Sequence, residues 1–224
     1  MKPDQLVIFD CDGVLVDSEP ITNRVFAQML GELGIPITLE DMYERFVGQS
    51  MAKCCELIAG MLGRPVPEGF VEEYRARSDE ALDSDLKAVP GIEAALDELD
   101  SIGVPYCVAS NGTQEKMRTT LGITGLLARF EGKLFSVTDV VRGKPAPDLF
   151  LHAAGSYGVT PSSCCVVEDT PTGVAAALAA GMIVYGYCAL TPEHQLLEAG
   201  AHYTFIDMLR LPELMFGAAT RALS

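Results

Sequence analysis

The sequence predicts an α/β protein with a doubly wound parallel sheet and a small helical domain inserted after the first strand. Three observations predict this. Apolar runs of strand length alternate with helical patterns after residue 90, as in parallel sheets. Residues 18–86 carry helical patterns with no strand. Polar residues follow the apolar runs, at the edge where such sheets bind ligands. We expect the core at 1–17 and 87–224 and the helical domain at 18–86.

The first strand is expected at Leu6–Phe9, where four apolar residues in a row indicate a strand buried on both faces. It ends at Asp10 and Asp12, followed by Gly13. Two ionised carboxylates are costly to bury unless they are compensated. Mg²⁺ suits them better than zinc, because no Cys or His cluster stands beside them. A simple strand-to-turn signal is the alternative interpretation of the Asp-x-Asp-Gly segment.

The helical domain is expected to be a small bundle. Gly34 ends its first helix, and Thr38 with Asp41 resembles a capping box that begins the second. Ser50 is a possible cap for the third helix. The apolar faces of the four expected helices lie in Val25–Leu33, Met42–Val47, Cys54–Leu62 and Phe70–Leu82.

After Pro90 and Gly91, strands and helices alternate. The expected strands are Val104–Ala109, Leu134–Ser136, Cys164–Val167 and Met182–Tyr185. The expected helices are Ile92–Ile102, Thr113–Leu121, Gly143–Tyr157 and Pro171–Ala180. Thr170 is expected to cap the last of these, with Pro171 at its first position. The apolar segment 174–190 is better explained by a helix and a buried strand than by a membrane span, because glycines interrupt it.

Composition narrows the class of partner. The formal net charge of −15 argues against binding to nucleic acid or to an anionic membrane surface. The seven cysteines include no C-x-x-C pair, and we recognise no secretory segment ahead of them, so reduced thiols in a cytoplasmic protein are expected. A small molecule is the expected partner of a monomer or a small homo-oligomer.

Polar residues that are far apart in sequence are predicted to converge at one edge of the sheet. They are Asp10, Asp12, Ser110, Asn111, Lys144, Glu168 and Asp169. Each has an ordinary explanation when taken alone, such as a solvated lysine, a turn serine or an acidic helix N-terminus. Their shared position after successive strands favours a site instead.

These residue types fit a metal-assisted phosphoryl-transfer site. Asp10 can attack phosphorus and become an aspartyl phosphate, while Asp12 can protonate the leaving oxygen and later activate water. Mg²⁺ held by Asp10 and Asp169 would offset negative charge, as would Lys144. Ser110 and the backbone N–H groups of its turn, which includes Asn111, would bind the remaining phosphate oxygens.

Four segments resemble the motifs of the haloacid dehalogenase superfamily in order and spacing: FDCDGVLVDSE, ASNG, GKPAPDLF and VVEDTPTGVAAALAAG. The nearest branch resembles the β-phosphoglucomutase-like phosphatases, and the sequence is similar to bacterial 6-phosphogluconate phosphatases. The resemblance implies a Rossmann-like core with residues 18–86 as a helical cap. It also implies that Mg²⁺ is bound by Asp10, the Asp12 carbonyl and Asp169, with Glu168 at or near the metal.

The resemblance also ranks the possible reactions. Asp12 argues against dehalogenase and phosphonate-cleaving members. Thr22 and Met51 stand where the mutase branch carries a histidine and an arginine. We therefore expect a Mg²⁺-dependent phosphomonoesterase for a small phosphorylated metabolite, either a sugar phosphate or a phosphosugar acid such as 6-phosphogluconate. A phosphosugar mutase and an inactive phosphate-binding module are the alternatives. Gln49 is the expected substrate contact in the cap, with Arg45 and Lys53 as weaker candidates.

Overall fold

The computed structural model describes residues 5–38, 41–42, 45–47 and 51–220. The chain divides into two compact units. One unit comprises Met1–Val16 and Ala88–Ser224, and the other is Asp17–Lys87. We call the first the sheet unit and the second the helical unit. The division falls next to the expected domain boundaries, and the role of the helical unit as a cap stays a prediction.

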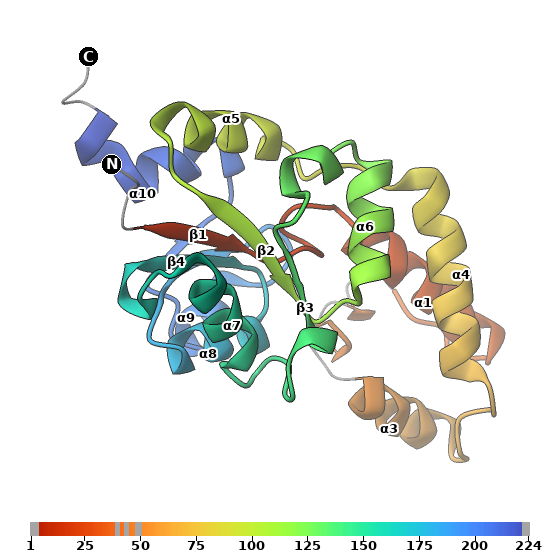
Figure 1. Ribbon diagram of the computed structural model, residues 1–224. Helices are drawn as coiled ribbons and strands as arrows, with labels where there is room; N and C mark the ends of the chain where they lie inside the picture. Colours follow the sequence, from red (N-terminus) through yellow and green to blue (C-terminus); the bar gives the residue numbers. More distant parts are fainter. Residues whose placement is uncertain (1–4, 39–40, 43–44, 48–50, 221–224) are drawn as a thin grey trace. The chain divides into compact units, whose positions relative to one another are not determined.

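The sheet unit is built on six parallel strands, drawn as arrows in Figure 1. They are β1 (Leu6–Phe9), β2 (Tyr106–Ser110), β3 (Leu134–Ser136), β4 (Cys164–Glu168), β5 (Ile183–Tyr187) and β6 (Tyr203–Phe205). Their order across the sheet is β3-β2-β1-β4-β5-β6, with β1 in the middle. The chain moves outward from β1 in both directions, which confirms the doubly wound α/β fold.

Helices cover both faces of this sheet. The helices are α5 (Ile92–Ile102), α6 (Gln114–Ile123), α7 (Asp148–Tyr157), α8 (Pro171–Ala179), α9 (Glu193–Glu198) and α10 (Leu211–Thr220). The short 3₁₀ turns are η1 (Leu127–Phe130), η2 (Val137–Asp139), η3 (Pro161–Ser163) and η4 (Met208–Arg210). Leu6 and Ile8 of β1 pack in one core with α7, α8 and α9, which lie on one side of the sheet in Figure 1, while α5 and α10 lie on the other. All four residues of β1 are fully buried, as the unbroken apolar run predicts.

One expected helix begins later than predicted. The sequence indicates a helix from Gly143, but α7 begins at Asp148, and the segment before it forms turns. The Ala146 N–H donates to the Gly143 carbonyl over 2.9 Å. The reason is that Pro145 and Pro147 each disfavour helical backbone at the residue before them.

The helical unit contains α1 (Glu19–Glu32), α3 (Met51–Leu62) and α4 (Phe70–Asp85). Its core is aromatic: the Phe26 ring makes edge contacts with Phe46, Phe70 and Tyr74. The capping box is present. The Thr38 backbone N–H donates to the Asp41 carboxylate, and the Asp41 backbone N–H donates to the Thr38 hydroxyl, each over 3.1 Å. The expected cap Ser50 and part of the expected second helix lie outside the described residues.

The segment 174–190 folds as most of α8 followed by β5. Across the described ranges, we find no helix with the length and apolarity that a membrane crossing requires. All seven cysteines are free thiols.

Candidate active site

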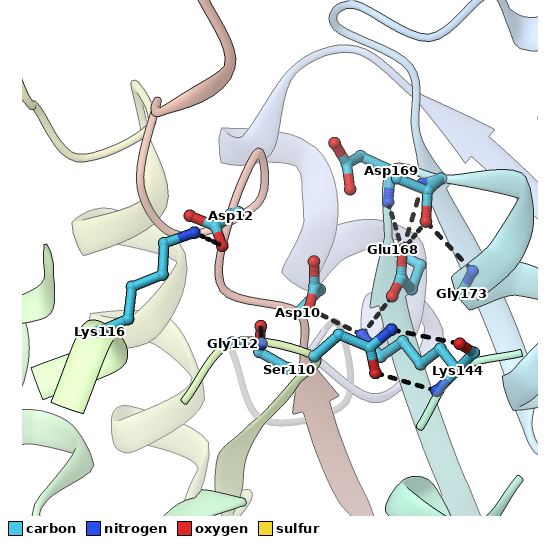
Figure 2. Close-up of polar contacts among 11 residues, drawn as sticks. Asp10, Asp12, Ser110, Gly112, Lys116, Lys144, Glu168, Asp169 and Gly173 are labelled. Carbon is cyan, nitrogen blue, oxygen red and sulfur yellow. Dashed lines mark hydrogen bonds and ion pairs between the residues drawn. The ribbon is translucent and has the colours of Figure 1, made fainter. Parts of the chain in front are cut away.

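Three adjacent strands bring the predicted site residues to one edge of the sheet. Asp10 directly follows β1, Ser110 ends β2 and Glu168 ends β4. In the strand register, Phe9 is opposite both Val108 and Val167, so the three strands end at the same level. Figure 2 shows their polar side chains gathered there.

Lys144 links two of these strand ends. Its Nζ lies 2.7 Å from Asp10 Oδ1 and 2.5 Å from Glu168 Oε1, and only 4% of its side chain is exposed. Burial alone would lower the pKa of Lys144, but the charges of Asp10 and Glu168 raise it above its ordinary value. Lys144 is therefore a charged ammonium held between two buried carboxylates.

Asp10 is a strongly perturbed carboxylate at the end of the central strand. Burial raises its pKa to about 7, although the Lys144 charge acts in the opposite direction, and the nearby Glu168 charge adds to the rise. Another cation at this position would lower the pKa of Asp10 and favour its ionised form. The site thus favours binding of positive charge beside Asp10.

Glu168 orients the groups around it. Its side chain is fully buried, and its Oε2 accepts from the Asp169 N–H (3.1 Å), the Thr170 N–H (3.2 Å) and the Thr170 Oγ1 (3.0 Å). Thr170 caps α8 as predicted, accepting from the Gly173 N–H. A Cβ at Gly173 would stand 1.9 Å from the Glu168 carboxyl, so this helix start approaches the carboxylate as only glycine allows.

The turn after β2 holds the backbone of Lys144 through hydrogen bonds. The Asn111 Oδ1 accepts from the Lys144 N–H over 2.9 Å, and the Asn111 Nδ2 donates to the Lys144 carbonyl over 3.2 Å. Ser110 is buried, and its Oγ accepts from the Gly112 N–H. The structure thus gives Asn111 a scaffolding contact, and phosphate binding by Ser110 and Asn111 stays a prediction.

Three of the predicted metal ligands form one cluster. Asp10, Glu168 and Asp169 are buried, and each offers a carboxylate oxygen within 4.8 Å of the others. The loop residue Gly13 makes room for Asp169: its φ is +77°, and a Cβ there would lie 2.1 Å from Asp169 Oδ2. A set of oxygen donors alone fits Mg²⁺. The Asp12 carboxylate does not belong to this cluster, and metal binding through the Asp12 carbonyl stays a prediction.

The family model of the haloacid dehalogenase-like hydrolases matches residues 5–181. The chain belongs to this family. It is 36% identical over 211 residues to the 6-phosphogluconate phosphatase of Escherichia coli, a match that covers 94% of each chain. These similarities confirm the expected enzyme class, a phosphatase of the haloacid dehalogenase-like family.

Solved structures of the family share the fold. A family hydrolase from Deinococcus radiodurans, determined with bound phosphate and sodium, is 30% identical with a TM-score of 0.83, over 97% of both chains. A β-phosphoglucomutase-like protein from Thermotoga maritima is 28% identical with a TM-score of 0.76, over 94% of this chain and 98% of that one. The expected position near the β-phosphoglucomutase-like branch is thereby confirmed.

One site residue lies outside all four family motifs. Lys116, on the first turn of α6, has its Nζ 2.7 Å from Asp12 Oδ2. The sequence gives no direct signal for it, because a lysine near the start of a helix is ordinarily solvated. Only its position six residues after Ser110, in the first turn of the helix that follows the site, could have drawn attention to it.

The helical unit carries the three residues that were predicted as substrate contacts. Gln49 lies outside the described residues. Arg45 is exposed, and Lys53 forms an exposed ion pair with Glu56 over 2.9 Å. A role for any of the three in substrate binding stays a prediction.

Proposed function

We propose that this protein is a Mg²⁺-dependent phosphomonoesterase that forms an aspartyl phosphate on Asp10. The observation that supports the proposal best is the buried Asp10 itself, paired with Lys144 and clustered with Asp169 at the end of the central strand. A buried carboxylate with a raised pKa beside a fixed cation is typical of a catalytic group.

In the first half of the reaction, an Asp10 carboxylate oxygen attacks phosphorus, and the bond from phosphorus to the ester oxygen breaks. Asp12 gives its proton to the departing alkoxide. In the second half, Asp12 takes a proton from water, whose oxygen attacks phosphorus and releases Asp10 and inorganic phosphate. Lys144 stabilises the negative charge that gathers around the phosphoryl group, with Ser110 and its turn binding phosphoryl oxygens.

Mg²⁺ would be held by Asp10, the Asp12 carbonyl and Asp169, with Glu168 at or near it. When bound, the ion would act as a Lewis acid and neutralise charge on the phosphoryl group. The buried all-oxygen donor set supports this choice of metal.

For the substrate, we propose a sugar phosphate or a phosphosugar acid, with 6-phosphogluconate as the first to test. The support is the 36% identity, over nearly the whole chain, to an enzyme named for that substrate. We further propose that the helical unit serves as a cap that selects the substrate and that Gln49 contributes to it.

Mutase activity is the less favoured alternative. The position where mutases carry an arginine is occupied by Met51, which packs against the core of the helical unit. The position of their histidine is Thr22, whose Oγ1 donates to the Glu19 carbonyl within α1. Neither residue supplies a cation for a second phosphate. An inactive phosphate-binding module is disfavoured because Asp10, Asp12 and Lys144 are all present.

The test is phosphate release from 6-phosphogluconate and a panel of sugar phosphates. We expect activity with Mg²⁺, none in excess chelator, and recovery when Mg²⁺ is restored. Ca²⁺ should inhibit, because its looser coordination shell tolerates bidentate carboxylates and would misplace Asp10. Full activity in excess chelator would contradict the metal requirement.

Asp10→Asn tests the nucleophile. The change keeps the shape of the side chain but removes the attacking charge, so phosphate release should fall by at least about 10³-fold, the scale of losing a catalytic nucleophile. A thermal melt should show that the variant folds. A folded Asp10→Asn protein with near wild-type phosphate release would overturn the assignment.

A further inference from the structure

We propose that Lys116 is a positioning residue that holds the Asp12 carboxylate where it exchanges protons with the substrate oxygen and with water. This inference rests on the proposed function, because it takes Asp12 as the acid/base. The observation behind it is the charge-assisted hydrogen bond of 2.7 Å between Lys116 Nζ and Asp12 Oδ2, drawn in Figure 2.

The fold specifies the position of Lys116. Thr113 caps α6, and its Oγ1 accepts from the Lys116 N–H over 3.2 Å, which fixes the first turn of the helix. The Lys116 side chain then extends past Gly112, where a Cβ would lie 3.7 Å from Lys116 Cδ. The same short segment therefore forms the turn that holds Ser110 and aims Lys116 at Asp12.

A second contact ties the same face of α6 to the loop after β1. Thr120, one turn beyond Lys116, has its Oγ1 3.9 Å from the Sγ of buried Cys11, and the Thr120 hydroxyl donates to the Lys116 carbonyl over 3.0 Å. Residues four apart lie on one face of a helix. This face consequently contacts two consecutive residues of the loop, Cys11 and Asp12.

The Lys116–Asp12 ion pair is less exposed than an ordinary surface ion pair. The side chains of Lys116 and Asp12 are 40% and 27% exposed, against 49% and 62% for Arg118 and Glu131, the next ion pair of α6. Desolvation by itself would lower the pKa of Lys116, but the charge of Asp12 raises it. Lys116 is thus a charged donor in a partly desolvated position.

Lys116 also changes the charge of the site. Asp10, Asp12, Glu168 and Asp169 with Lys144 alone would carry a formal charge of −3. Lys116 makes it −2, which one divalent cation neutralises. With Asp12 ionised, as it is when it takes a proton from water, the site would be neutral with one Mg²⁺ bound.

The test compares kcat/KM for an alkyl phosphate and for p-nitrophenyl phosphate. An alkoxide needs a proton to leave, whereas p-nitrophenolate leaves without one, so loss of acid catalysis affects the alkyl ester alone. Lys116→Met should lower kcat/KM for a sugar phosphate by about 10- to 100-fold, at or below the ~10²-fold lower end for general acid catalysis because Asp12 itself remains, and for the aryl ester by less than about threefold. Lys116→Arg should restore part of the loss, because it keeps a charged donor.

Two control variants show whether a negative result contradicts the role of Asp12 or only that of Lys116. Arg118→Met, on the same helix, removes an ion pair away from the site and should leave both substrates unaffected. Asp12→Asn should show the same discrimination as Lys116→Met, only larger. If Asp12→Asn does not discriminate between the two esters, the acid role of Asp12 fails, and the inference fails with it.

If Asp12→Asn discriminates and a folded Lys116→Met protein does not, the inference alone is overturned. A rise in KM for anionic sugars with kcat unchanged would also overturn it, because Lys116 would then bind substrate instead. Thermal melts should be the same in Lys116→Met and wild type.

Discussion

At Lys144, stability and the proposed catalysis depend on the same side chain. It is a buried cation shared by the carboxylates of Asp10 and Glu168. Removing one partner of such a pair leaves buried charge uncompensated, which costs about 3–5 kcal/mol. We predict that Lys144→Met lowers the free energy of unfolding by about that amount and abolishes phosphate release.

A double variant separates the two effects. In Lys144→Met/Glu168→Gln, one of the two carboxylates left buried without their cation is replaced by a neutral amide, so part of the stability should return. Activity should stay lost, because the phosphoryl group has no ammonium to meet. Urea unfolding and phosphate release measure the two quantities. Recovery of activity together with stability would mean that Lys144 has only a structural role.

The two lysines of the site show what can be predicted from residues alone. Lys144 is predictable because it stands in the Gly-Lys-Pro segment after a strand, where the family resemblance applies. Lys116 looks like any lysine of a solvated helix face. Its contact with Asp12 bridges positions far apart in sequence and depends on how α6 packs, which sequence spacing does not encode.

At the scale of elements, the start of α8 is packed against the site. A Cβ at Gly173 would meet the Glu168 carboxyl at 1.9 Å, and Glu168 is fixed by four hydrogen bonds. We predict that Gly173→Ala destabilises the protein by about 1–3 kcal/mol, the usual cost of overpacking, and lowers activity because Glu168 and Lys144 move.

Gly155 in α7 is the matched control. It too lies within a helix, but a Cβ there meets nothing within 4 Å. Alanine should therefore stabilise α7 by about 0.5–1 kcal/mol without changing activity. Melting temperatures and phosphate release of the two alanine variants test the pair. Equal effects on stability would contradict the close approach at Gly173.

The buried elements are the ones that the sequence predicts best. The runs of β1, β2 and β4 are apolar because both faces of a central strand are covered, and all three were expected. The edge strand β6 was missed, since its residues are exposed or half-buried and carry no apolar run. The short helix α9 was also missed, because only Leu196 of it is buried.

At the scale of the whole molecule, the choice between hydrolysis and transfer remains the central prediction. Both reactions share an aspartyl phosphate and differ in what accepts the phosphoryl group next, water or a second hydroxyl of the sugar. For transfer to win over solvent, the enzyme must hold that hydroxyl in near-attack geometry. Thr22 and Met51 both lack the basic group that the mutase branch uses there.

We therefore predict that water is the acceptor and that free phosphate appears in step with substrate loss. Phosphorus NMR should follow β-glucose 1-phosphate and 6-phosphogluconate in separate tubes with Mg²⁺. Conversion of the first to glucose 6-phosphate with little free phosphate would overturn the phosphatase proposal. Rapid phosphate release from the second would support 6-phosphogluconate as substrate. If 6-phosphogluconate releases no phosphate but another sugar phosphate does, the proposed substrate is wrong and the proposed reaction stands. The two can fail separately because the groups proposed to perform the chemistry lie in the sheet unit, while selection of the substrate is assigned to the helical unit.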